Sequence, residues 1–136
     1  SIFDPLMKRV LDEANDSNDE KVQTSVPDVK EMSPKEASEE VTQSDLVPAV
    51  VGEGKKVIEQ SQPAGTSMLT GERVILVTNG TLTMPDITGW SRLDVMKLSE
   101  LTGIDLDVQG NGYVTKQSVA PGEKLSKQTK LTVELK

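Results

Sequence analysis

The sequence VPDV at residues 26–29 returns as MPDI at residues 84–87. From this recurrence, residues 26–78 align with residues 84–135 at an offset of 58 positions, which becomes 57 after a single-residue deletion. The alignment holds ten identities over the 53 positions of the first copy, six before the deletion and four after it. The chain therefore contains one short unit twice, and repeats of this kind are units of architecture.

Most of the identities fall on residue types that set backbone geometry. Pro and Gly restrict or widen the allowed backbone angles, and Asp and Ser hydrogen-bond to nearby backbone groups. The ten are Pro27, Asp28, Ser33, Val50, Gly52, Gly54, Val57, Gln60, Ser61 and Gly65. A small unit duplicated for its shape is typical of a binding or spacing module rather than of an enzyme.

The composition of the 136-residue chain narrows the classes of function. The absence of Cys and His excludes disulfides and thiolate metal sites, and it removes the commonest general base and metal ligand. A net charge of −7 and a single Trp, Tyr and Phe argue against nucleic-acid binding, because counterion release and base stacking are both missing. No apolar run approaches the roughly 20 residues of a membrane span. We expect no cofactor, no nucleic-acid partner and no membrane insertion by this chain.

Residues 1–11 have the spacing of a short amphipathic helix, with their large apolar side chains on one stripe. Those side chains belong to Phe3, Leu6, Met7, Val10 and Leu11. Residues 12–25 are polar and acidic and are predicted to form a linker. Because a helix this short is marginal alone, we interpret it as the C-terminal helix of a preceding domain; packing on the repeats is the alternative.

Each repeat is predicted to contain one helix packed on three short strands, which gives an α+β fold. A capping box at Ser33 and a looser one at Ser91 mark the two helix starts. Residues 104–109 alternate apolar and polar side chains, as a half-buried strand does. Further strands are predicted at residues 57–61, 73–78, 114–118 and 130–135.

One strand of the first repeat differs from its counterpart in the second. Residues 74–77, VILV, are apolar on both faces, whereas residues 131–135 alternate. A strand that is apolar on both faces is typical of a sheet covered on both sides, although β-propensity alone also produces such a run. We therefore predict that the first repeat buries its second face against a neighbour.

The ordered set of V/M-P-D-V/I, a capped helix, V-x-G-x-G, Q-S and a P-A-G or A-P-G turn resembles the PASTA domain. The resemblance covers residues 26–135 and implies PASTA domain 1 at residues 26–78 and PASTA domain 2 at residues 84–135. It implies two small units, each with one helix on a three-stranded sheet. Such units occur outside the cell membrane in Gram-positive penicillin-binding proteins and Ser/Thr kinases.

Three further stretches favour one host. FDPLMK at residues 3–8 resembles the final helix of a penicillin-binding transpeptidase domain. MPDITGW at residues 84–90 and LDVQGNG at residues 106–112 resemble the second PASTA unit of division-type class B penicillin-binding proteins of the 2x kind. The resemblance implies two compactly packed units at the tail of a D,D-transpeptidase, outside the membrane at the division septum. The rival interpretation is a PASTA ectodomain of a membrane Ser/Thr kinase that senses muropeptides or β-lactams.

The first unit departs from the family pattern in two places. Glu31 stands where the second unit has Gly89, and the first helix lacks a Leu-rich core face. Both departures weaken the first unit as an independent domain. They agree with the doubly apolar strand in favouring a first unit that packs against a neighbour.

The motifs of a penicillin-binding transpeptidase are missing from the sequence, because it has no Ser-x-x-Lys, Ser-x-Asn or Lys-Thr-Gly. We predict that this chain is not an enzyme, although its parent protein is one. The carboxylate pairs Glu39-Glu40 and Asp105/Asp107 are compatible with acid–base or calcium chemistry. Solvated charge is the simpler interpretation, so no catalytic or metal-binding residue is assigned.

Candidate ligand-binding residues lie in the second unit. Four lysines are close together in the sequence, where peptidoglycan carboxylates or teichoic phosphates would be attracted; a soluble surface is the simpler interpretation. They are Lys116, Lys124, Lys127 and Lys130. Trp90 is suited to stacking on a sugar or to packing ahead of the helix, and Tyr113 beside the Gly-x-Gly turn is equally open.

Together these patterns predict a non-catalytic chain that supports or localises septal cell-wall synthesis. The expected partners are its own transpeptidase domain, peptidoglycan or muropeptides, and division proteins.

Overall fold

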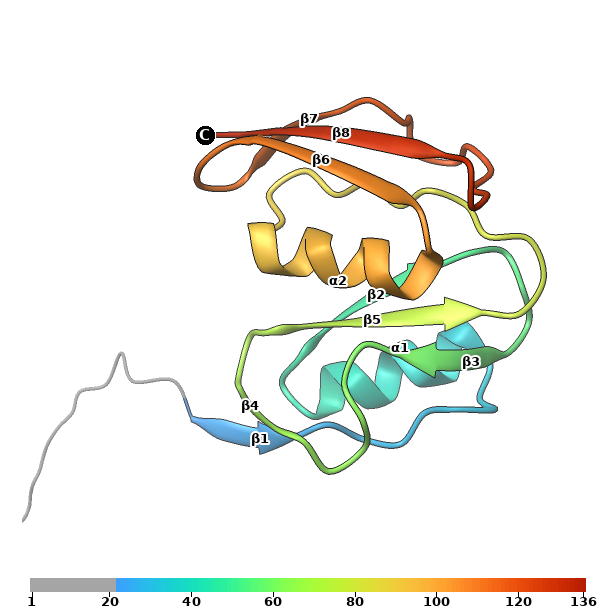
Figure 1. The fold of residues 1–136 in the computed structure, drawn as a ribbon. Helices are drawn as coiled ribbons and strands as arrows, with labels where there is room; N and C mark the ends of the chain where they lie inside the picture. Colours follow the sequence, from blue (N-terminus) through green and yellow to red (C-terminus); the bar gives the residue numbers. More distant parts are fainter. Residues whose placement is uncertain (1–21) are drawn as a thin grey trace, which may run out of the picture.

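A computed structural model of the protein describes residues 22–136. The helix predicted at residues 1–11 and most of the linker predicted at residues 12–25 lie outside them. The described chain contains two helix-and-sheet units in sequence order, as the duplication predicts (Figure 1). The α+β fold class, with one helix on a three-stranded sheet in each repeat, is confirmed.

The two helices begin where the capping signals predict. Helix α1 spans Pro34–Gln43 and helix α2 spans Arg92–Thr102. Ser33 accepts a hydrogen bond from the Glu36 amide at 3.2 Å, and Ser91 accepts one from the Asp94 amide at 3.2 Å. Each bond satisfies one of the amides that a helix start leaves without an intrahelical partner.

The first sheet consists of β2 (Val47–Val51), β5 (Arg73–Thr78) and β3 (Val57–Gln60), in the order β2-β5-β3. The second sheet consists of β6 (Asp105–Gly110), β8 (Lys130–Leu135) and β7 (Val114–Gln117), in the order β6-β8-β7. In both sheets the central strand pairs parallel to the first strand and antiparallel to the other. The two sheets therefore have the same topology, and their residues can be compared position by position.

A further two-stranded sheet was not predicted. Strand β1 (Gln23–Ser25) pairs antiparallel with β4 (Ser67–Leu69), so the chain is held to the first unit before the VPDV stretch begins. The sequence predicts residues 23–25 as the end of the linker and predicts no helix or strand at residues 67–69.

The described chain forms four layers: α1, the first sheet, α2 and the second sheet (Figure 1). The first core lies between α1 and the first sheet. It consists of Val26, Val29, Ala37, Val41, Leu46, Val57, Val74 and Leu76. The joint core lies around α2, and it takes residues from both units. It consists of Val51, Ile75, Val77, Met84, Ile87, Trp90, Val95, Leu98, Ile104, Val114, Val119, Leu131, Val133 and Leu135.

A glutamine side chain, buried for Gln60 and half-buried for Gln117, fastens the start of each unit to its sheet. The Gln60 amide accepts a bond from Val29 N at 3.2 Å and donates to the carbonyl of Pro27 at 3.0 Å. Gln117 repeats the arrangement with Ile87 N at 3.0 Å and the Pro85 carbonyl at 3.2 Å. An unpaired buried amide is costly, so this side chain supplies partners that a strand would otherwise provide. The identity of Gln in both repeats is therefore explained by backbone satisfaction.

The Gly-x-Gly turns are close approaches between two backbone segments. A Cβ atom at Gly54 would collide with the Asn79 carbonyl, and one at Gly112 would collide with that of Lys136. Gly112 also has a φ of 106°, in the region that favours glycine. The turns carry the chain past the end of the central strand, from one edge strand of the sheet to the other. The glycines shared by the two repeats, like the shared glutamine, are therefore explained by the backbone geometry of the unit.

Candidate functional site at the junction of the units

Strand β5 is where the two units meet. Its side chains alternate between two cores: Val74 and Leu76 belong to the first core, and Ile75 and Val77 belong to the joint core. All four are at most 3% exposed. The prediction that this strand buries both faces is confirmed, and the neighbour on its second face is α2 of the second unit.

An ion pair closes one end of this junction. Arg73 Nη1 donates to Asp94 Oδ2 at 2.7 Å, which joins the start of β5 to the first turn of α2. The two side chains are 23% and 16% exposed, so the pair is partly withdrawn from water. The Arg73 guanidinium also lies 4.6 Å from the centroid of the Trp90 ring, within the range of a cation–π interaction. One arginine thus contacts two groups of the other unit.

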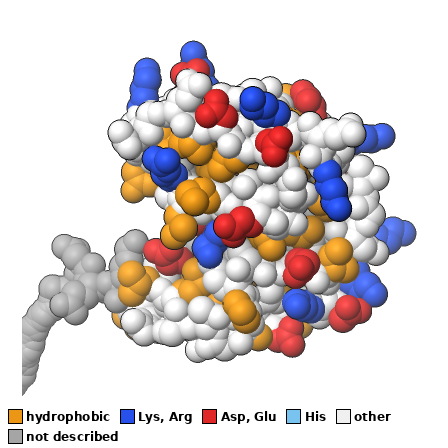
Figure 2. Space-filling view, in the orientation of Figure 1, with side chains coloured by type: hydrophobic (Ala, Val, Ile, Leu, Met, Phe, Trp, Pro, Cys, Tyr) orange, Lys and Arg blue, Asp and Glu red, His pale blue; other side chains and the backbone are white. Residues whose placement is uncertain are grey.

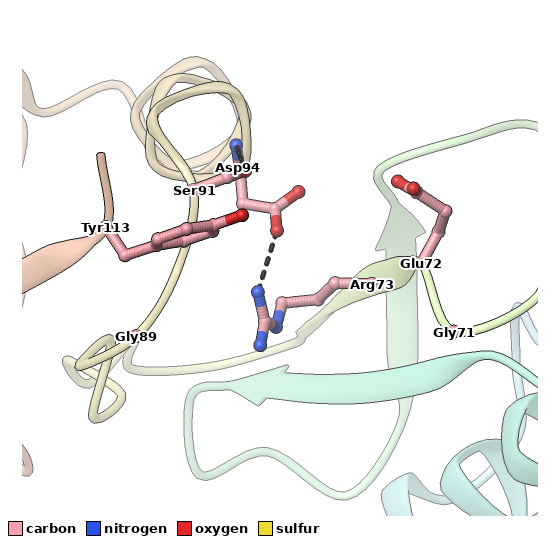
Figure 3. A pocket seen from close by; sticks show the side chains of 7 residues that line it. All are labelled: Gly71, Glu72, Arg73, Gly89, Ser91, Asp94 and Tyr113. Carbon is pink, nitrogen blue, oxygen red and sulfur yellow. Dashed lines mark hydrogen bonds and ion pairs between the residues drawn. The ribbon is translucent and has the colours of Figure 1, made fainter. Parts of the chain in front are cut away.

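A pocket of about 180 Å³ opens beside this ion pair (Figure 3). The first unit contributes Gly71, Glu72 and Arg73, and the second contributes Gly89, Ser91, Asp94 and Tyr113. Strand β5 and helix α2 both begin at the left of Figure 1, and Figure 2 shows the surface indented between the units on that side. The pocket exists only because the two units are packed in this way, which makes it the candidate functional site.

The groups that line the pocket suit polar recognition or a structural joint. Glu72, Arg73 and Asp94 supply charge, and Tyr113 supplies an exposed ring and hydroxyl. The Ser91 hydroxyl is engaged as the cap of α2, where it accepts the Asp94 amide. These contacts hold backbone and side chains in place, and they do not pair the serine with a base that would make it a nucleophile.

No group of three His, Cys, Asp or Glu side chains within residues 22–136 is placed to hold a metal ion. Neither α1 nor α2 is long and apolar enough to span a bilayer. The Thr88 backbone amide, at 3.1 Å, and the Thr88 hydroxyl hold the pKa of the exposed Asp86 carboxyl below its ordinary value of 3.8. That shift belongs to a turn and marks no reactive group.

The structure separates the two aromatic residues predicted as ligand-binding. Trp90 is only 4% exposed and lies in the joint core with Arg73 over its ring. Of its two interpretations, packing is the one that this burial supports, and we do not retain it in a ligand-binding set. Tyr113 is 62% exposed and reaches into the junction pocket (Figure 3), so its ring is free to contact a ligand.

The four predicted lysines are exposed but do not form a patch of one sign. Lys130 at the start of β8 stands opposite Asp105, and Lys116 on β7 stands opposite Glu134 at the other end of the same strand. Lys124 forms an isolated antiparallel bridge with Thr83, and Lys127 lies in the turn directly before β8. Figure 2 shows acidic and basic side chains interspersed over the face turned to the viewer. The four lysines are therefore close together in the sequence but dispersed over the surface.

The sequence did not point to Arg73 and Asp94 as partners. The available signal was a basic residue directly before the doubly apolar strand, and an acidic residue one position before Val95 in the helix start. Connecting them required the helix of one unit to be placed on the sheet of the other. That placement is a tertiary fact, which the spacing within each repeat does not contain.

Comparisons with known proteins agree with this architecture. The PASTA domain family model matches residues 24–80 and 82–136, so the chain belongs to the PASTA domain family. PASTA domains are non-catalytic. The match begins inside β1 and thus includes part of the unpredicted strand.

Solved structures with the same units are also similar. Penicillin Binding Protein 2X from Streptococcus thermophilus is 33% identical with a TM-score of 0.75, over 86% of this chain and 17% of that one. A three-PASTA-domain structure of a Ser/Thr kinase from Staphylococcus aureus is 20% identical with a TM-score of 0.36, over 82% of this chain and 66% of that one. The chain therefore spans about a sixth of the length of the penicillin-binding protein that it resembles.

Proposed function

We propose that this chain is the non-catalytic PASTA region of a penicillin-binding protein, a peptidoglycan D,D-transpeptidase. In this proposal it supports or localises septal cell-wall synthesis through contacts with the transpeptidase domain, with peptidoglycan, or with both. The parent protein is anchored in the membrane, and this region lies on its outer face in a Gram-positive bacterium. The transpeptidase activity belongs to the parent protein, and the role of this region is to position it.

The observation that carries the proposal is the similarity to Penicillin Binding Protein 2X at a TM-score of 0.75 over 86% of this chain. Each unit accounts for about half of the aligned residues, so a score this high requires both units to superpose together. The shared feature is thus the packing of one unit on the other as well as the unit itself. Arg73, Asp94 and Val77 make that packing in this chain.

The physical role that follows is positioning. A stack whose layers share a joint core holds its surfaces at fixed distances, unlike units on a flexible linker. A domain tethered to such a stack is presented to its partner at a raised effective concentration without any new contact in its own active site. The chain needs no reactive group for this role.

Contact with the wall is the part of the proposal that names residues. Tyr113 offers an exposed ring at the junction pocket, and Lys116, Lys124, Lys127 and Lys130 offer exposed cations. Stem-peptide carboxylates or wall phosphates are the groups that these cations would attract, over a range limited by salt. Because carboxylates stand beside the cations of the second sheet, we expect this attraction to be weak and dependent on ionic strength.

The proposal is tested by titrating uncross-linked muropeptides into the ¹⁵N-labelled chain and following the backbone amide shifts. A parallel experiment measures sedimentation of the chain with purified peptidoglycan sacculi. A positioning role predicts no saturable muropeptide shifts, together with retention on sacculi or binding to the transpeptidase domain. Changing Lys116 and Lys130 to Gln should lower retention on sacculi, whereas Lys55→Gln in the first unit serves as the matched control.

The rival function is sensing of muropeptides or β-lactams by a kinase ectodomain. Saturable shifts clustered on one face of the molecule would support it and would contradict a purely positioning role. The host is tested separately by the coding sequence upstream of Ser1. A membrane span directly before residue 1 would overturn the transpeptidase assignment, and a domain with Ser-x-x-Lys, Ser-x-Asn and Lys-Thr-Gly would support it.

A further inference from the structure

The first sheet presents a face that fits the helix of another unit. This stacking face consists of Ala49 and Val51 on β2 with Ile75 and Val77 on β5. The Arg73–Asp94 pair places the Asp94 side of α2 over this face. Leu98 and Leu101, four and seven residues further on, follow on the same side of the helix and belong to or pack against the joint core. Burial of these apolar side chains supplies the attraction. The Arg73–Asp94 pair fixes the register.

The second sheet has the same topology but lacks such a face. The repeat alignment places Asp107, Gln109, Thr132 and Glu134 at the positions of Ala49, Val51, Ile75 and Val77. Three of these polar side chains are exposed, and Thr132 is half-buried. All four positions that hold α2 on the first sheet are thus polar on the second sheet, on the side away from the joint core.

Helix α1 shows the complementary change. Its positions equivalent to Leu98 and Leu101 of α2 are Glu40 and Gln43, and both are exposed. The charges of the ion pair at the junction are kept at both ends. Glu36 on α1 stands at the position of Asp94, and Lys130 on β8 stands at the position of Arg73. The apolar positions are therefore the ones that distinguish the two ends of the stack from its middle.

We infer that the stack is closed at both ends: its stacking face accepts one PASTA helix, and six polar residues prevent a second copy of this chain from continuing the series. The six are Asp107, Gln109, Thr132 and Glu134 on the second sheet, with Glu40 and Gln43 on α1. Stacked repeats need polar end faces for solubility, and a head-to-tail contact that does not close produces filaments. A third unit of this kind would meet polar side chains at all six of these positions.

The inference is tested by placing, on the second sheet and on α1, the apolar residue types that occupy the equivalent positions of the first sheet and α2. A sheet variant carries D107A, Q109V, T132I and E134V, and a helix variant carries E40L and Q43L. Sedimentation equilibrium is measured for the wild-type chain, for each variant and for an equimolar mixture. We expect the wild type to remain monomeric and the mixture to form a 1:1 complex of twice the monomer mass. A chain with all six substitutions should form longer, concentration-dependent assemblies.

The control for non-specific hydrophobic association is E39L with T42L. It adds the same two leucine side chains to α1, but outside the stripe that contains Glu40 and Gln43. A mixture of this control with the sheet variant should remain monomeric. The inference is overturned if the mixture of sheet and helix variants stays monomeric while both retain native NMR spectra, or if the control associates equally well. Should the sheet variant lose its native spectrum, T132I with E134V replaces it, and a complex of lower affinity is then expected.

Discussion

The two units have the same elements in the same order, yet the second faces of their sheets have opposite character. On the first sheet, Ile75 and Val77 are at most 3% exposed beneath α2. On the second sheet, Thr132 and Glu134 occupy the equivalent positions and face outward. Duplication of one unit has thus produced an inner layer and an end layer from the same backbone. The signature residues are shared because both layers need the same turns, and the face residues differ because their neighbours differ.

The largest effect is expected where the inner layer receives an end-layer residue. Val77→Glu places a carboxylate without a partner in the joint core, and we expect a loss of about 3–5 kcal/mol in the free energy of unfolding. Val77→Thr gives a smaller loss of about 1–2 kcal/mol, in case the glutamate variant does not fold. Urea unfolding measures both.

The reverse change at the equivalent position is the control. Glu134→Val on the exposed face of β8 should change the free energy of unfolding by no more than about 0.5 kcal/mol. Equal losses for Val77→Glu and Glu134→Val would mean that the two faces are not different environments.

A smaller effect is expected at the ion pair between the units. Arg73→Met leaves the partly buried Asp94 carboxylate without its partner and removes the cation from Trp90, so we expect a loss of about 1–3 kcal/mol. A double-mutant cycle with Asp94→Asn should give a coupling of about 1 kcal/mol. The exposed Glu31–Lys56 pair, with side chains 73% and 46% exposed, is the comparison, and its coupling should stay below about 0.5 kcal/mol. Similar couplings would contradict a special role for the junction.

The third effect concerns one backbone position in the two units. Glu31 has a φ of 74° and its counterpart Gly89 has a φ of 86°, so both residues lie in the left-handed region. Gly89→Ala should destabilise by about 1 kcal/mol, because a Cβ atom is strained there. Glu31→Gly should stabilise by about 0.5 kcal/mol after loss of its exposed ion pair. Thermal unfolding of both variants checks the sign, and a destabilising Glu31→Gly would refute the interpretation.

The smallest effect is a dependence on pH at the start of the second unit. The pKa of Asp86 is lowered because its carboxylate accepts the Thr88 amide and hydroxyl, so the charged form is favoured in the folded chain. Its contribution to stability is therefore present above pH 3.8 and is lost as the pH falls through the lower folded pKa. The Thr88 amide shift should titrate in the wild type and remain constant in Asp86→Asn. A constant shift in the wild type would contradict the hydrogen bond.

Much of the fold could be predicted from the sequence because the same unit occurs in it twice. Ser33 and Ser91 located the helix starts, and the doubly apolar strand at residues 74–77 indicated a covered second face. What covers that face could not be predicted, because the repeat spacing says nothing about the orientation of one unit on the other. Strand β1 was missed for another reason: Gln23–Ser25 contains no apolar alternation and pairs with a segment more than 40 residues away.

The candidate site was less accessible to prediction than the fold. Tyr113 was singled out and does line the junction pocket, but its neighbours Arg73 and Asp94 come from both units and were not connected. Lys116 and Lys130, which are close in sequence, stand near opposite ends of β8. A site formed by packing between repeats is specified by tertiary contacts, whereas a cluster of like residues in the sequence need not remain a cluster on a twisted sheet.

The hydrogen bonds of Gln60 and Gln117 have a consequence for hydrogen–deuterium exchange. The amides of Val29 and Ile87 lie outside every strand and helix that the structure describes, yet both residues are fully buried and each amide donates to a glutamine side-chain oxygen. Solvent reaches these protons only when the glutamine side chain withdraws, which opens the core around it. Two loop protons should therefore exchange as slowly as those of the central strands, and they report on each unit separately.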